Sequence, residues 1–167
     1  MARVQKPKGG KNKGKSKVVT VRFDPKLKYL AELAARRQRR TLSSFIEWAV
    51  EDSLTRLHPA YDVHGEAQPT FADKASALWD VDESDRFAKL ALNYPELLDH
   101  EEQRIWKLVR ENGLLWRGSH SGPGKEWTWE VRESKLRWDR LRAHWETFRD
   151  VARGHKPPSA LDDEIPF

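Results

Sequence analysis

Residues 18–57, VVTVRFDPKLKYLAELAARRQRRTLSSFIEWAVEDSLTRL, decide how the amino-terminal part of the chain folds. The first six residues are rich in β-branched side chains and alternate in orientation, which predicts a half-buried strand. Asp24 and Pro25 then predict a helix start, because a carboxylate caps the first amides and proline needs no amide partner there. A second helix is predicted with Ser43 as its cap. Both helices carry an apolar stripe, formed by Leu27, Leu30, Leu33 and Ala34 and by Leu42, Phe45, Ile46, Ala49, Val50, Leu54 and Leu57.

One strand and two short helices in about forty residues bury too little surface to form a core by themselves. A lone strand would also leave its backbone donors and acceptors unpaired. Two copies that pair their strands antiparallel and interlock their helices would solve both problems. The alternative is an ordinary βαα fragment inside a larger core of the same chain.

This stretch resembles the ribbon-helix-helix family of DNA-binding proteins, through the TVRFDPKL strand-to-helix junction and the TLSSFIEWAV start of the second helix. The resemblance implies a homodimer whose two strands form a ribbon in the major groove. It also implies that the residues facing away from the helices read bases: Val18, Thr20 and Arg22. Arg22 would bond a guanine edge, Thr20 would donate or accept, and Val18 would meet a thymine methyl group.

Contacts to DNA phosphates are expected at two places in the same region. The start of the second helix offers free amides and a positive dipole end to an anion, at Leu42, Ser43 and Ser44. For Ser43 the alternative is a cap without DNA contact, and the two roles are compatible. The basic residues before the strand, Lys15 and Lys17, are the other candidates. We expect the cluster Arg36 to Arg40 to be a solvated helix end.

The net charge of +5 hides an uneven distribution along the chain. Residues 1–57 contain 15 Lys and Arg against 5 Asp and Glu, whereas the rest of the chain contains 16 against 21. Residues 1–17 hold six lysines and Arg3 and have nothing to bury, which predicts a disordered basic arm that lies along DNA. The alternative is a solubilising tail.

Several classes of protein are disfavoured by the composition. No apolar run approaches the ~20 residues of a membrane span, and there is no cysteine. A soluble intracellular protein is therefore expected, and the resemblance to bacterial DNA-binding proteins implies a cytoplasmic, nucleoid-associated one. Residues 9–16 fit the phosphate-binding pattern G-x-x-x-x-G-K-S, but that motif needs a strand before it and a helix after it. No catalytic arrangement and no paired histidine ligands are evident, so we expect neither an enzyme nor a cofactor or metal.

The remainder predicts a small Trp-rich α+β module, so the chain as a whole is expected to be mostly α. A linker is expected over 58–70 and the module over 71–154, with helices near 71–79, 82–93, 99–112 and 133–153. Asp82 or Ser84 is expected to cap the second of these helices, and Asp99 to Glu102 are expected to form a capping box at the start of the third. A hairpin is expected from strands at 114–117 and 126–131. Trp116, Trp127 and Trp129 on that hairpin are candidates for stacking single-stranded bases, with core packing as the alternative. Trp138, Leu141, Trp145 and Phe148 form a heptad seam, for which internal packing is favoured over a coiled coil.

A disordered acidic tail is expected over 155–167, ending DDEIPF. This end resembles the DDDIPF tip of bacterial single-stranded DNA-binding proteins. The resemblance implies a docking peptide for replication or repair proteins, with the terminal phenylalanine in an apolar pocket and the acids on a basic rim. The residues concerned are Asp162, Asp163, Glu164, Ile165, Pro166 and Phe167.

Together these features predict a homodimeric duplex-DNA-binding protein of ribbon-helix-helix type, most simply a transcriptional regulator. Two alternatives stay open. One is an accessory protein of DNA replication or recombination, of a mobile element, that recruits partners through its tail. The other is a single-strand binder that uses its tryptophans.

Overall fold

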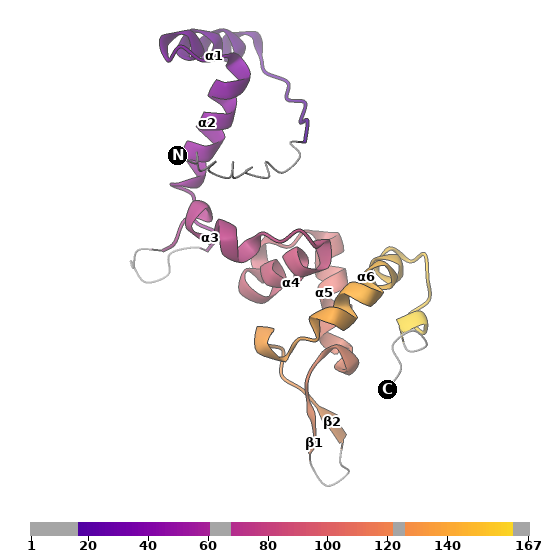
Figure 1. The fold of residues 1–167 in the computed structure, drawn as a ribbon. Helices are drawn as coiled ribbons and strands as arrows, with labels where there is room; N and C mark the ends of the chain where they lie inside the picture. Colours follow the sequence, from indigo (N-terminus) through magenta and orange to yellow (C-terminus); the bar gives the residue numbers. More distant parts are fainter. Residues whose placement is uncertain (1–16, 61–67, 122–125, 162–167) are drawn as a thin grey trace, which may run out of the picture. The chain divides into compact units, whose positions relative to one another are not determined.

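The computed structural model describes residues 17–60, 68–121 and 126–161. In these ranges the chain is mostly helical, with six α-helices and one small two-stranded antiparallel sheet (Figure 1). It divides into two compact units, residues 1–48 and 49–167, which are described separately. None of the described helices is long and apolar enough to cross a membrane.

The first unit contains α1 (Pro25–Arg37) and the first half of α2 (Leu42–Leu54). The predicted start of α1 is confirmed: the Asp24 carboxylate accepts hydrogen bonds of 3.0 Å from the amides of Lys26 and Leu27. The predicted cap of α2 is wrong. Thr41 takes this place, because its hydroxyl accepts from the Ser44 amide at 3.2 Å.

Residues 17–24 have no regular secondary structure in the single chain. A strand is defined by hydrogen bonds to a neighbour, and the expected neighbour is a second copy. The strand over residues 18–23 therefore stays a prediction.

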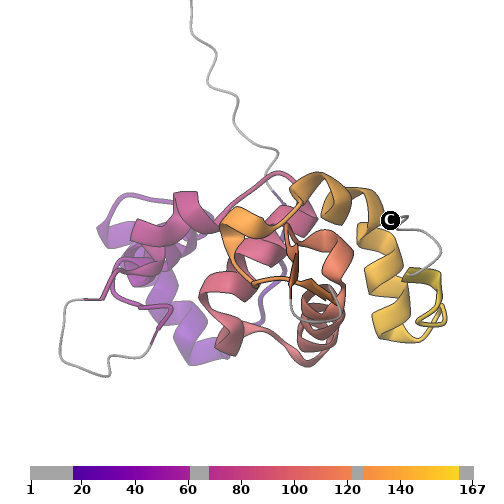
Figure 2. The same ribbon diagram turned by 90° about the horizontal axis from the view of Figure 1, so that it is seen from below.

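The second unit contains four helices in addition to the end of α2: α3 (Phe71–Leu78), α4 (Glu83–Asn93), α5 (His100–Glu111) and α6 (Trp138–Arg153). The predicted capping box of α5 is confirmed, with Asp99 and Glu102 exchanging hydrogen bonds of 2.8 and 2.9 Å. Of the two predicted cap residues of α4, Asp82 and Ser84, the structure shows Asp82 as the cap. Helices α4, α5 and α6 pack against one another (Figures 1 and 2).

The hairpin is confirmed but its first strand is displaced. β1 (Ser119–Ser121) pairs antiparallel with β2 (Glu126–Thr128), with His120 opposite Trp127. The predicted strand at 114–117 is wrong: Gly113–Leu115 form a 3₁₀ turn, since the Asn112 side chain accepts from the Leu114 amide at 3.1 Å. Only Trp116 forms a bridge, to Leu136.

The last helix also begins later than predicted. A separate 3₁₀ turn occupies Glu133–Lys135, and α6 starts at Trp138. The amide of Arg137 bonds the Leu115 carbonyl at 2.8 Å, and the carbonyl of Lys135 accepts from the Arg117 amide at 2.7 Å. These long-range backbone bonds hold Leu136 extended and keep Arg137 out of the helical conformation, so α6 cannot begin before Trp138.

The core of the second unit lies between α4, α5, α6 and the turn before the hairpin. Phe148, Leu141, Leu115 and Trp116 are fully buried. The heptad seam of α6 therefore packs within its own chain, as predicted. Asp85 on α4 is only 3% exposed and pairs with Arg142 on α6, and this hydrogen-bonded pairing raises the pKa of Arg142.

The folded part extends beyond the predicted end of the module. Gly154 ends α6 in the left-handed conformation (φ 79°), and the His155 amide then bonds the Asp150 carbonyl at 2.8 Å. Leu161 is only 4% exposed and belongs to the core. A disordered tail starting at 155 is therefore wrong for 155–161, because Leu161 buries apolar surface. Residues 162–167 lie outside the described residues.

The two ends of the predicted linker are joined by hydrogen bonds. The Phe71 amide donates to the Leu57 carbonyl at 2.9 Å, and His58 Nδ1 lies 3.3 Å from the Pro69 carbonyl oxygen. The two described ends of the segment 58–70 are thus held side by side. Residues 61–67 lie outside the described residues.

Candidate nucleic-acid interface

The first unit leaves its apolar stripe uncovered. Of the residues in α1 only Ala35 is buried, and α2 buries none. Leu30, in the middle of the α1 stripe, is 51% exposed. The other large apolar side chains exposed in the described part of this unit are Val18, Val19, Val21, Leu27, Tyr29 and Leu33. At the end of α2 and just after it, in the second unit, Val50, Leu54 and Leu57 are exposed as well. Amphipathic helices of a folded protein normally cover such a stripe, so this surface lacks a partner among the described residues of its own unit.

The segment before α1 is unpaired as well. Val18 is 96% exposed and Val19 is 79% exposed. Among the described residues, 18–23 make no backbone hydrogen bond with one another or with the helices. No other described backbone group thus occupies the amides and carbonyls of this segment, and another strand could pair with them.

The three residues predicted to read bases all lie in this segment and all are exposed: Val18, Thr20 and Arg22. Arg22 forms no ion pair with any described residue. Its five guanidinium donors are available to a base edge or a phosphate. Lys17 is exposed too, whereas Lys15 lies outside the described residues.

The start of α2 is exposed, as a phosphate-binding site requires, but one of its amides is already hydrogen-bonded. Ser43 and Ser44 are exposed and Leu42 is half-buried. The Ser44 amide already donates to the Thr41 hydroxyl, so the amides of Leu42 and Ser43 are the ones left for a phosphate.

A tight turn that the sequence analysis missed joins the two helices. Arg39 has φ 54°, and the Arg40 amide bonds the Ala35 carbonyl at 2.9 Å, the pattern of a Schellman helix end. Arginine is not the residue expected in a left-handed conformation, so no sequence signal indicated it. The guanidinium of Arg40 then lies 5.6 Å from the centre of the Trp48 ring, which leans on Phe45 at 5.7 Å.

The three tryptophans predicted to stack bases have different environments. Trp116 is fully buried and its indole N–H donates to the Val109 carbonyl at 2.9 Å, so it belongs to the core and cannot meet a base. Trp127 and Trp129 are half-buried on the hairpin. Their indole N–H groups bond backbone carbonyls at 3.1 and 3.0 Å, which orients the rings.

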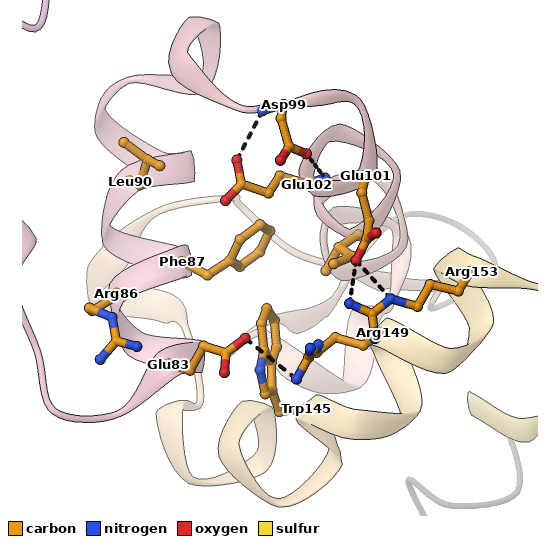
Figure 3. A pocket seen from close by; sticks show the side chains of 11 residues that line it. Glu83, Arg86, Phe87, Leu90, Asp99, Glu101, Glu102, Trp145, Arg149 and Arg153 are labelled. Carbon is orange, nitrogen blue, oxygen red and sulfur yellow. Dashed lines mark hydrogen bonds and ion pairs between the residues drawn. The ribbon is translucent and has the colours of Figure 1, made fainter. Parts of the chain in front are cut away.

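A pocket of about 410 Å³ lies between α4, α5 and α6, and no sequence signal marked it. Phe87 contributes to its apolar wall (Figure 3). Its charged residues pair with one another, Arg149 with Glu83 at 3.5 Å and Arg153 with Glu101 at 2.7 Å. Hydrogen bonding to Glu101 raises the pKa of Arg153. Four carboxylates and three arginines belong to the described lining, so the pocket offers no excess of positive charge to an anion.

No group of three potential metal ligands gathers anywhere in the described ranges. Among the described surfaces, residues 17–24 and the apolar stripe of the first unit are the ones that most clearly lack hydrogen-bond and packing partners.

None of the protein-family models, curated proteins or solved structures compared with the chain matches it.

Proposed function

We propose that the chain is a homodimeric duplex-DNA-binding protein of ribbon-helix-helix type, and that its simplest role is transcriptional regulation. The observation that carries this proposal is the exposed apolar stripe next to an unpaired extended segment.

A second copy of the chain fits both requirements at once. Antiparallel pairing of residues 18–23 with the same residues of another copy satisfies both backbones through one symmetric contact. The same contact brings together two α1 helices whose leucines are half exposed in the single chain. A different partner would need both a matching strand and a matching apolar face.

The side chains of residues 18–23 alternate between two faces of the strand, one for packing against the helices and one for DNA. In a paired strand, Val19, Val21 and Phe23 share the face toward the helices, and Val18, Thr20 and Arg22 share the other. The second face meets DNA, where a two-stranded ribbon fits the major groove. The excess of 15 basic over 5 acidic residues in 1–57 suits a polyanion.

Selection of binding sites from random duplex DNA, followed by gel-shift titration of the best site, tests the proposal. Arg22→Ala should cost roughly 1–3 kcal/mol at the selected site and relax one base preference. Arg37→Ala is the matched control, since Arg37 is an exposed arginine at the end of α1 with no expected base contact. Failure to enrich any duplex sequence, or equal effects of the two variants, would argue against a base-reading ribbon.

A second candidate role is that of an accessory protein in DNA replication or recombination, suggested by the terminal sequence DDEIPF. A peptide of this kind would recruit replication or repair proteins to the bound DNA. Removing Phe167 should abolish capture of proteins that bind the tip of single-stranded DNA-binding proteins, with duplex affinity unchanged. If the intact chain does not capture them, the chain has no such role.

A further inference from the structure

The second unit contains a small pocket beside the hairpin that differs in charge from the pocket between α4, α5 and α6. It has a volume of about 300 Å³ and is lined by Leu114, His120, Trp127, Arg137 and Arg140. The described lining thus combines two guanidinium groups, an imidazole and an indole with one leucine, and no carboxylate is among these described residues. Side chains of these kinds are chemically suited to an anionic ligand that carries an apolar or aromatic group.

Trp127 is held in place by the backbone around it. Its indole N–H donates to the Gly113 carbonyl at 3.1 Å. A Cβ atom at Gly118 would lie 2.9 Å from Cε2 of the Trp127 ring, and one at Gly113 would lie 3.0 Å from Cδ1. Both positions therefore require glycine for the ring edge to approach the backbone. The ring of His120 packs at 5.1 Å from that of Trp127, in an edge-on geometry. The result is a half-exposed aromatic side chain in a defined orientation.

The two arginines keep most of their hydrogen-bonding capacity. Arg140 donates one bond, from Nη1 to the Leu114 carbonyl at 3.1 Å. Arg137 is anchored by its backbone amide, which bonds the Leu115 carbonyl at 2.8 Å. Among the described residues neither guanidinium pairs with a carboxylate, in contrast to Arg149 and Arg153 in the larger pocket. No described carboxylate thus neutralises their positive charge.

We propose that this pocket binds an unpaired base of single-stranded nucleic acid, with the base against Trp127 and the adjacent phosphates on Arg137 and Arg140. Aromatic side chains next to cations are how proteins bind single strands without sequence preference. Bases within a duplex stack on one another and cannot enter a pocket. The site lies wholly in the second unit, so it adds single-strand binding to the proposed duplex binding and does not depend on it.

The first test measures binding of the full chain to a short labelled oligothymidylate and to an abasic oligomer with the same number of phosphates. The oligothymidylate should bind more tightly, because only it offers bases to stack. Trp127→Ala should reduce its affinity about 5- to 150-fold, the range typical of one stacked base. Trp127→Phe, which keeps an aromatic ring, should recover part of the loss. Equal affinities of the wild-type chain for the two oligomers would overturn the proposal.

Arg137→Gln provides a variant that leaves the hairpin packing intact, because the Arg137 side chain makes no described hydrogen bond. It should weaken binding of the oligothymidylate, whereas Arg104→Gln, which removes an exposed arginine on α5, should not. Affinity for the selected duplex should be unchanged in Arg137→Gln. Equal loss of duplex and single-strand affinity would show instead that the pocket is a contact for duplex phosphates.

Photocrosslinking locates the bound base directly. An oligomer containing 5-iodouracil should crosslink to the tryptic peptide 126–132, which contains Trp127. Crosslinks found only within residues 1–57 would overturn the proposal. Competition with thymidine monophosphate distinguishes the two sources of this ligand chemistry. If the mononucleotide abolishes the crosslink, the pocket binds nucleotides and a free nucleotide is sufficient as its ligand. If only an oligomer abolishes the crosslink, the pocket binds a nucleotide that is part of a strand.

Discussion

Replacing Leu30 by alanine tests whether the stripe on α1 is a dimer interface. Leu30 is 51% exposed in the single chain, so about half of its surface remains for a partner to cover. Full burial of a leucine contributes about 1.5–3 kcal/mol, and half of that is about 0.8–1.5 kcal/mol. In a symmetric dimer the change occurs twice. The expected loss is therefore about 1.5–3 kcal/mol per dimer, or a dissociation constant about 10- to 150-fold higher.

Sedimentation equilibrium of the full chain over a wide concentration range measures this constant. Alanine has the highest helix propensity, so the substitution should leave α1 itself intact, which circular dichroism can verify. The matched control is Leu97→Ala. Leu97 is 40% exposed at the end of the 3₁₀ turn Pro95–Leu97, in the second unit, and no partner is proposed for it. Dimerisation of this variant should equal that of the wild type.

Two results would refute the reasoning about Leu30. One is a wild-type chain that stays monomeric throughout the concentration range although its first unit is folded. The other is a dimer that Leu30→Ala and Leu97→Ala weaken to the same extent, which would mean that the α1 stripe is not its interface. In either case the residues expected to read bases would lack the second strand that places them in a groove.

Two further predictions concern stability. Thr41→Ala should destabilise α2 by about 0.5–2 kcal/mol, whereas Ser43→Ala should have a much smaller effect, because only the Thr41 hydroxyl caps the helix; thermal melts followed by circular dichroism compare the two. The hydrogen bond from the Lys89 ammonium lowers the pKa of Asp80. Its contribution to stability is thus fully present above the ordinary carboxyl pKa of about 4 and is lost as the pH falls through the lowered pKa of the folded state. The urea concentration at the midpoint of unfolding should therefore decrease when the pH is lowered below about 4, and it should decrease less in Asp80→Asn. Equal decreases in the two proteins would contradict this role.

Features that depend on near neighbours in the sequence were predicted well. Asp24 caps α1 and Asp99 forms the capping box of α5, because these hydrogen bonds join residues at most three positions apart. The cap of α2 was misplaced because Thr41 and Ser43 are both good cap residues two positions apart. Sequence alone does not decide between them, since the helix start depends on how the turn after α1 closes.

Features that depend on distant neighbours were predicted poorly. The apolar run Leu114 to Trp116 suits a strand or a buried turn equally well. It forms a turn because the Arg137 amide donates to the Leu115 carbonyl and the Trp116 indole N–H donates to the Val109 carbonyl. Leu161 was placed in the tail because its surroundings are polar, although it packs into the core from beyond α6.

The sequence by itself determined where the helices lie, which faces of them are apolar, and that basic residues gather before and within the first unit. Periodicity and caps are properties of a few consecutive residues, so they can be deduced without coordinates. Only the tertiary structure decided that Trp116 is core while Trp127 faces a cationic pocket, and that the stripe of α1 remains uncovered in a single chain. Burial is set by segments far apart in the sequence, and no local pattern reports which of them meet.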